Sequence, residues 1–240
     1  MELVFNKEYT VEATDVNMFG KLRPARLLEI IQTVSGLHAE KLGLGSDILN
    51  PKNLSWVVVR QRIEIRRMPV QDEVLHITTW PGKGVHGLFP RYMEIRDGAG
   101  NALVLSCFLW VIMDMESRIM IQPAAFGLNM PIPEKDALMP LPRLPKQLLP
   151  ECRKASFTVP YSFIDVVGHM NNTRYVEISE NLLDAPRAGK ELRELIIEFT
   201  HELKLDETME LTIGKEGSRC SVKGMKADAP VFTLFLTYEE

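Results

Sequence analysis

The spacing of hydrophobic residues predicts one helix followed by a series of strands in the first half of the chain. Residues 8–14 alternate as a strand does, and a helix is expected from Pro24, a residue suited to a first helical turn. Strands are expected at 56–59, 63–65, 74–77, 92–95 and 102–113. A helix followed by strands, without alternating βα units, predicts an α+β fold with an antiparallel sheet.

Prolines gather in the middle of the chain. Seven of the 15 prolines lie in residues 123–150, and such a density excludes a helix or a central strand. This segment is therefore expected to be a stiff crossing linker. It separates an N-terminal domain of residues 1–122 from a C-terminal domain of residues 151–240.

The two halves repeat each other. At an offset of 148 residues, 9–30 align with 157–178, and the identical pairs are Thr10/Thr158, Val11/Val159, Gly20/Gly168, Arg26/Arg174, Glu29/Glu177 and Ile30/Ile178. At an offset of 134, Ile63–Glu64 align with Ile197–Glu198. The change of offset means that the first half carries 14 extra residues, which we expect in Gly43–Leu54. Both halves are therefore expected to use the same supersecondary unit.

A polar segment before the helix of the second half is the strongest candidate for chemistry. Asp165 precedes His169 by four residues, and Asn171 or Asn172 is a good N-cap for the helix that follows. His169 would then lie just outside a helix N-terminus, where free N–H groups and the helix dipole favour negative charge. Such a place can polarise a carbonyl group and stabilise an oxyanion.

Three titratable residues of the second half, two of them in this segment, have no acid–base counterpart in the first half. The aligned pairs are Asp165 with Asn17, His169 with Lys21, and Glu202 with Met68. A duplicated fold that keeps one functional site would show this pattern. The alternative is that polar surface positions have diverged freely.

Composition narrows the classes of function. The net charge of −4 argues against a nucleic-acid binder. No apolar run approaches the roughly 18 residues of a membrane span, and the start lacks the pattern of a secretory signal. The three cysteines, Cys107, Cys152 and Cys220, are too scattered for a disulfide framework or a zinc site. We therefore expect a cytoplasmic protein without a metal or another cofactor.

The segment Asp165-x-x-x-His169-Met170-Asn171-Asn172-Thr173-Arg174-Tyr175 resembles the active-site signature of plant and bacterial acyl-acyl carrier protein thioesterases. Segments 56–60, 106–114 and 197–203 resemble three strands of the same family, in the same order. The resemblance covers nearly the whole chain. It implies two tandem hotdog domains, each a long helix wrapped by an antiparallel sheet, which pack together as a pseudo-dimer.

The resemblance assigns Asp165, His169 and Glu202 as the catalytic set. Two positions depart from the family pattern. Val167 replaces the asparagine that usually follows the aspartate by two residues, so any role of that amide is lost or passed to another group. Leu203 replaces a cysteine found after the glutamate in some plant members, which favours attack by water over a covalent cysteine mechanism.

The expected reaction is hydrolysis of a fatty acyl thioester in fatty acid biosynthesis. The thioester carbonyl would point at the helix N-terminus near Asn171, Asn172 and Thr173, whose N–H groups would stabilise the oxyanion. Glu202 with His169 would orient and deprotonate a water. Asp165 would set the position and protonation state of His169. The sequence leaves open whether Glu202 or His169 takes the proton.

The resemblance implies two further binding regions. An acidic carrier protein needs a basic patch, and the cluster Arg60, Arg62, Arg66 and Arg67 provides one; a solvated strand face is the equal alternative. By analogy with the family, the acyl chain lies in the first hotdog, with Leu28, Ile31 and Trp56 as lining residues. These positions also suit an ordinary core.

The resulting hypothesis is an acyl-acyl carrier protein thioesterase, with acyl chain length and further oligomerisation left open. One alternative is a thioesterase that acts on acyl-coenzyme A. Another is a non-catalytic module that binds acyl chains on the same fold, which Val167 keeps open. A hotdog dehydratase is less favoured because the second half shows no pattern for it.

Overall fold

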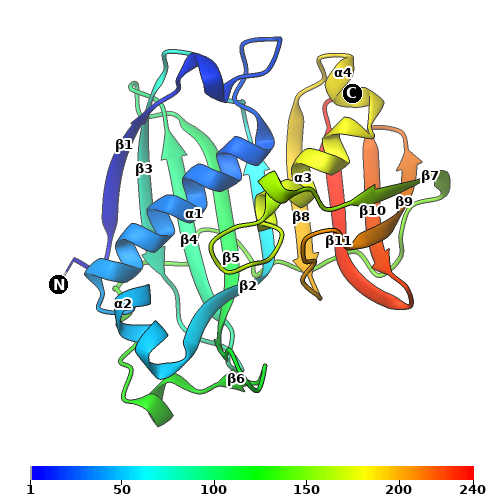
Figure 1. Ribbon diagram of the computed structural model, residues 1–240. Helices are drawn as coiled ribbons and strands as arrows, with labels where there is room; N and C mark the ends of the chain where they lie inside the picture. The colour runs from blue at the N-terminus through cyan, green and yellow to red at the C-terminus, as the bar shows by residue number, and fades with distance from the viewer. Residues whose placement is uncertain (1) are drawn as a thin grey trace.

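Eleven strands form a single antiparallel sheet in the computed structural model, which describes residues 2–240 (Figure 1). The strands of the first half are β1 (Phe5–Thr10), β2 (Leu54–Ile65), β3 (Val74–Pro81), β4 (Phe89–Arg96), β5 (Ala102–Asp114) and the short β6 (Met120–Ile121). Those of the second half are β7 (Glu151–Thr158), β8 (Leu192–Phe199), β9 (Thr208–Glu216), β10 (Arg219–Lys226) and β11 (Ala229–Tyr238). The helices are α1 (Pro24–Lys41), α2 (Ser46–Leu49), α3 (Asn172–Asn181) and α4 (Asp184–Arg187).

The strand order is symmetric about the centre of the sheet. It runs β1-β3-β4-β5-β2 through the first half and continues β8-β11-β10-β9-β7 through the second, with β6 added beside β5. At the centre, β2 pairs with β8, and Arg62 lies opposite Ile196. These two residues are also equivalent in the repeat, at the offset of 134 residues. The β2–β8 pair therefore lies on a pseudo-two-fold axis.

Helices α1 and α3 lie side by side on one face of this sheet (Figure 1). Leu27, Leu28, Ile31 and Val34 of α1 are buried against the strands at the spacing of one helical face. Replacing such a side chain by alanine typically costs about 2–5 kcal/mol of stability. The α+β prediction and the two-hotdog architecture are confirmed.

The internal repeat is confirmed by matching backbone hydrogen bonds. The Leu22 N–H donates to Pro69 O over 2.8 Å, and the Met170 N–H donates to Leu203 O over 2.7 Å. These pairs are equivalent at the offsets of 148 and 134. Gly20 and Gly168 share a left-handed backbone, with φ of 70° and 84°. A side chain at either position would strain this turn, which explains why glycine is kept in both halves.

The extra residues of the first half are not where the sequence placed them. Helix α1 has 18 residues and α3 has 10, so eight of the 14 extra residues lengthen the helix. Segment Gly43–Leu54 accounts for few of them. The prediction was wrong because the equivalent helix of the second half ends after 10 residues, at Asn181, whereas α1 continues to Lys41 before its glycine cap at Gly43.

The proline-rich segment contains a short 3-10 turn at Pro123–Phe126 and no strand within 123–150. It packs against the sheet, where Met139 contacts a small cluster with Trp80, Tyr92 and Cys107. Strand β1 begins at Phe5, earlier than the expected residue 8, and ends at Thr10.

Candidate active site

The turn before α3 holds Asp165 and His169 together through the backbone. The Asp165 N–H donates to the His169 carbonyl over 2.9 Å, and Asp165 Oδ1 accepts from the Val167 N–H over 2.9 Å. Asn171 is the N-cap of α3, and its Oδ1 accepts from the Thr173 N–H and hydroxyl over 3.0 and 2.8 Å. The cap fixes the entry of the chain into the helix, and so fixes His169 at its N-terminus.

His169 meets Glu202 from the loop after β8. Their atoms Nε2 and Oε1 lie 2.9 Å apart, and the His169 side chain is 15% exposed whereas Glu202 is 37% exposed. The same Glu202 Oε1 lies 2.7 Å from Arg118 Nη2. The structure thus brings together two of the three predicted catalytic side chains and adds Arg118.

Sequence reasoning missed Arg118. This residue lies in the turn between β5 and β6, and so comes from the first half of the chain, 84 residues before Glu202. No repeat, spacing or periodicity connects the two positions. Only the arrangement of the two halves around one sheet places the guanidinium beside the carboxylate.

Within residues 2–240, the side chain of Asp165 makes no hydrogen bond or ion pair with His169; its observed partner is the Val167 N–H. Asp165 therefore orders the turn, and its link to His169 is through the backbone. The Val167 side chain is 52% exposed. Leu203 is fully buried, so the residue after Glu202 points into the core.

The helix N-terminus offers fewer free N–H groups than expected. The Thr173 N–H is used by the Asn171 cap, and the Arg174 N–H donates to the Asn171 carbonyl over 3.0 Å. In residues 2–240, no acceptor is found for the Asn172 N–H. Asn172 is therefore the member of the predicted oxyanion group whose backbone donor is available.

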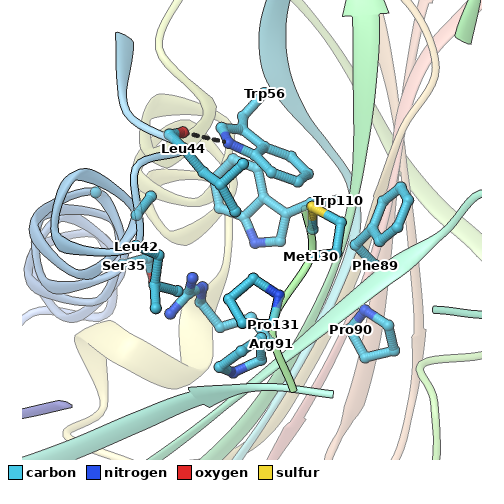
Figure 2. A pocket seen from close by; sticks show the side chains of 13 residues that line it. Ser35, Leu42, Leu44, Trp56, Phe89, Pro90, Arg91, Trp110, Met130 and Pro131 are labelled. Atoms are coloured by element: carbon cyan, nitrogen blue, oxygen red, sulfur yellow. Dashed lines mark hydrogen bonds between the residues drawn. The ribbon is translucent and has the colours of Figure 1, made fainter. Parts of the chain in front are cut away.

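An apolar pocket of about 120 Å³ lies between the second half of α1 and strands β2, β3, β4 and β5 of the first half (Figure 2). It is lined by Ser35, Gly36, Ala39, Leu42, Leu44, Trp56, Pro81, Phe89, Pro90, Arg91, Trp110, Met130 and Pro131. Trp56 was expected here and is fixed by its Nε1–H bond to Leu44 O over 2.9 Å. Leu28 and Ile31 do not line it and belong to the core instead.

A partly buried cation, Arg91, lies at this pocket. Arg91 Nη1 donates to His38 Nδ1 over 2.8 Å, and His38 Nε2 lies 3.0 Å from Glu2 O. Burial lowers the pKa of Arg91 to about 10 and also lowers the pKa of His38, because both charged forms lose hydration. His38 therefore accepts from Arg91 as a neutral ring.

The predicted arginine cluster is largely occupied by carboxylates of the chain itself. Arg60 is ion-paired with Glu198, Arg62 Nη2 lies 2.7 Å from Glu194 Oε1, and Arg67 Nη2 lies 2.5 Å from Glu73 Oε1. Arg66 is exposed and has no ion pair within residues 2–240. The structure thus leaves one of the four cations unpaired, which gives the carrier-docking prediction little support.

In the part of the chain that the structure describes, no three metal-ligating side chains gather in one place. The same residues contain no helix long and apolar enough to cross a membrane. Burial raises the pKa of Cys107 to about 12, and Cys152 is exposed on β7.

Models of two protein domains match this chain. Residues 2–123 match the acyl-ACP thioesterase N-terminal domain, and residues 147–228 match the acyl-ACP thioesterase C-terminal domain, where ACP is acyl carrier protein. The chain belongs to the acyl-ACP thioesterase family. It is 23% identical over 226 residues to the chloroplastic palmitoyl-acyl carrier protein thioesterase of Cuphea hookeriana, covering 87% of this chain and 54% of that relative. The chain spans about half the length of the curated relatives it matches.

Solved structures share the fold of this family member. An acyl-ACP thioesterase from Bacteroides thetaiotaomicron superimposes with a TM-score of 0.83 at 21% identity, covering 98% of both chains. The 12:0-ACP thioesterase from Umbellularia californica gives a TM-score of 0.82 at 19% identity, covering 100% of this chain and 98% of that one. At these identities the likeness establishes the double-hotdog architecture.

Proposed function

We propose that this protein hydrolyses fatty acyl-acyl carrier protein to a free fatty acid and the carrier thiol, as a step of fatty acid biosynthesis. The observation that carries the proposal is the 2.9 Å contact between His169 and Glu202 in a member of the acyl-ACP thioesterase family. An acid and an imidazole in contact supply the proton transfers that thioester hydrolysis requires.

The two oxygens of Glu202 have different surroundings. Oε1 accepts from Arg118 and lies 2.9 Å from His169 Nε2, whereas no partner of Oε2 is found within residues 2–240. In our proposal Oε2 binds the attacking water and takes its proton as the water oxygen bonds to the thioester carbon. This geometry favours Glu202 over His169 as the proton acceptor.

The tetrahedral intermediate then collapses. The carbon–sulfur bond breaks, the carbonyl re-forms, and the departing sulfur takes up the proton held by Glu202, so that one water is consumed for each acid and thiol released. The Asn172 N–H at the start of α3 is the proposed donor to the oxyanion. Asp165 keeps the turn in place. Because residue 167 is valine, no side-chain amide takes part at this position.

The acyl chain is proposed to occupy the pocket beside Trp56 and Trp110. Its lining is mostly apolar, and it lies in the N-terminal hotdog. The predicted lining residues Leu28 and Ile31 are replaced in this role by residues nearer the end of α1, such as Gly36 and Ala39.

The test is release of free thiol from acyl-acyl carrier proteins of different chain lengths, beside the matching coenzyme A esters. Glu202→Gln keeps the shape of the side chain and removes its basicity, so turnover should fall about 10²–10⁴-fold. Glu210→Gln, at an exposed position on β9, is the matched control and should behave as the unmodified protein.

Each outcome has a distinct meaning. Turnover confined to coenzyme A esters would show that the substrate is acyl-coenzyme A and not acyl-acyl carrier protein. Acyl binding without any turnover would indicate a binding module. The cytoplasmic location expected from the sequence stays a prediction.

A further inference from the structure

The candidate site contains a residue from each half of the chain. Arg118 belongs to the turn after β5, whereas Glu202 follows β8. Arg118 Nη2 and His169 Nε2 lie 2.7 and 2.9 Å from the same atom, Glu202 Oε1. The hydrogen bond from Arg118 and the close contact with His169 on one oxygen restrict rotation of the carboxylate about its last bond, because turning it would break both contacts.

The turn that carries Arg118 is itself fixed by several hydrogen bonds. Asp114 Oδ1 accepts from the Glu116 N–H, the Ser117 N–H and the Ser117 hydroxyl over 3.1, 2.8 and 2.9 Å. The Arg118 N–H donates to Asp114 O over 2.9 Å, and the Asp114 N–H donates to Ile119 O over 3.0 Å. The bonds from Ser117 and Glu116 lower the pKa of Asp114, so the carboxylate keeps its charge, and the turn its acceptor, to more acidic pH than a free aspartate would.

Glu202 is the carboxylate paired with Arg118 in residues 2–240. Arg118 also holds its backbone at φ of 58°, a left-handed conformation that non-glycine residues seldom adopt. A strained residue on an ordered turn, directed at a candidate catalytic group, is the arrangement expected where position matters.

We infer that Arg118 is a positioning residue for Glu202. It holds Oε1 together with His169 and thereby leaves Oε2 for the water. This inference rests on the proposed hydrolysis. It also gives the first hotdog a part in the chemistry besides its acyl pocket, because the catalytic carboxylate of the second half is oriented from the first.

A plain surface ion pair would behave differently. An exposed pair contributes about 0–1 kcal/mol to stability, so its loss would leave turnover unchanged. An arginine that docks the acidic carrier would raise KM and leave kcat unchanged. A positioning residue lowers kcat, because misplacement of a catalytic group can cost about 10²-fold in rate.

The experiment compares Arg118→Met and Arg118→Lys with the unmodified protein, measuring kcat and KM for thioester hydrolysis. Arg96→Met is the control, because Arg96 is 45% exposed and pairs with Glu94 over 2.6 Å, much as Arg118 is 42% exposed and pairs with Glu202. Thermal unfolding of each variant checks the fold.

We expect Arg118→Met to lower kcat by about 10–10²-fold with little change in KM. Arg118→Lys, or guanidinium added to Arg118→Met, should restore part of the rate, and Arg96→Met should match the unmodified protein. An unchanged kcat in Arg118→Met, or a change confined to KM, would overturn the inference while leaving the hydrolase proposal intact. If the unmodified protein shows no turnover, the proposed function fails first, and the inference fails with it.

Discussion

Lys21 occupies in the first half of the chain the place that His169 occupies in the second. The Asn17 N–H donates to Lys21 O over 2.8 Å, as the Asp165 N–H donates to His169 O over 2.9 Å. Their side chains have different partners. Lys21 Nζ pairs with Glu191 over 2.6 Å, whereas His169 meets Glu202. Of these two positions, which the pseudo-two-fold axis relates, one is thus occupied by an ion pair and the other belongs to the candidate site.

Replacing these two equivalent residues should have different results. Lys21→Met should lower the free energy of unfolding by about 1 kcal/mol or less and leave hydrolysis unchanged, because Glu191 also pairs with Arg193. His169→Ala should lower kcat by about 10²–10⁴-fold without a comparable loss of stability. Thermal unfolding and thiol release measure the two effects. An equal loss of turnover in both variants would contradict the assignment of a single site.

Gly36 offers a direct test of the acyl pocket. It lies inside α1 and lines the pocket, and a Cβ atom added there would meet nothing within 4 Å. Gly36→Leu should therefore fill the pocket and shift the preferred substrate to shorter acyl chains. The measurement is the ratio of kcat/KM between long and short acyl carrier proteins.

The control at the same position is Gly36→Ala. It should raise stability by about 1 kcal/mol, since alanine is the better helix former, and leave chain-length preference nearly unchanged. A chain-length preference that is the same in Gly36→Leu and the unmodified protein would place the acyl chain elsewhere.

The cysteines should be dispensable. Cys107 and Cys220 are buried, and burial raises the pKa of both thiols, which keeps them protonated and unreactive. Cys152 is exposed on β7, outside the group formed by His169, Glu202 and Arg118. Alkylation of the folded protein should therefore modify Cys152 and leave thiol release unchanged. Full inhibition by a thiol reagent, relieved by Cys152→Ser, would speak for a role of this thiol.

Glu180 of α3 should make stability depend on pH. Burial, helped by Glu177 and opposed by Arg23, raises its pKa from 4.5 to about 8. Below about pH 4.5 both the folded and unfolded states hold this proton. As pH rises from 4.5 toward 8, the unfolded state releases the proton before the folded state does. The free energy of unfolding therefore falls progressively over this range.

Glu180→Gln should remove that loss. As pH rises from 5 to 8, the free energy of unfolding of the variant should increase relative to that of the unmodified protein, by roughly 1–3 kcal/mol at pH 8. Urea unfolding at several pH values gives the comparison, with exposed Glu210→Gln as control. Parallel pH profiles for the unmodified protein and Glu180→Gln would show that Glu180 is hydrated in the folded state.

The sequence was most informative where local chemistry determines structure. Pro24 begins α1 as predicted, Asn171 caps α3, and the repeat located the equivalent turns at Gly20 and Gly168. Each of these depends on a few neighbouring residues. The contact between His169 and Glu202 was reached through resemblance, since 33 residues separate them in the chain.

What the sequence left out depends on long-range packing. Arg118 reaches Glu202 because β2 and β8 join the two halves, and no local pattern encodes that join. Leu28 and Ile31 were predicted as pocket residues and belong to the core, because they are as apolar as the residues that line the pocket beside Trp56. Small residues such as Gly36 leave room for the pocket because they have little or no side chain. For the same reason they do not stand out in the hydrophobic pattern of the sequence.

The symmetric strand order has a consequence for how such a protein can change. In a dimer of identical hotdogs, every substitution would appear at both ends of the central β2–β8 pair. Here one chain supplies both halves, so each end can be altered alone. Lys21 could close one end while His169 kept the other, and α1 could lengthen and hold a pocket without lengthening α3. Joining the halves in one chain therefore allows equivalent positions to take different roles, which two identical copies cannot do.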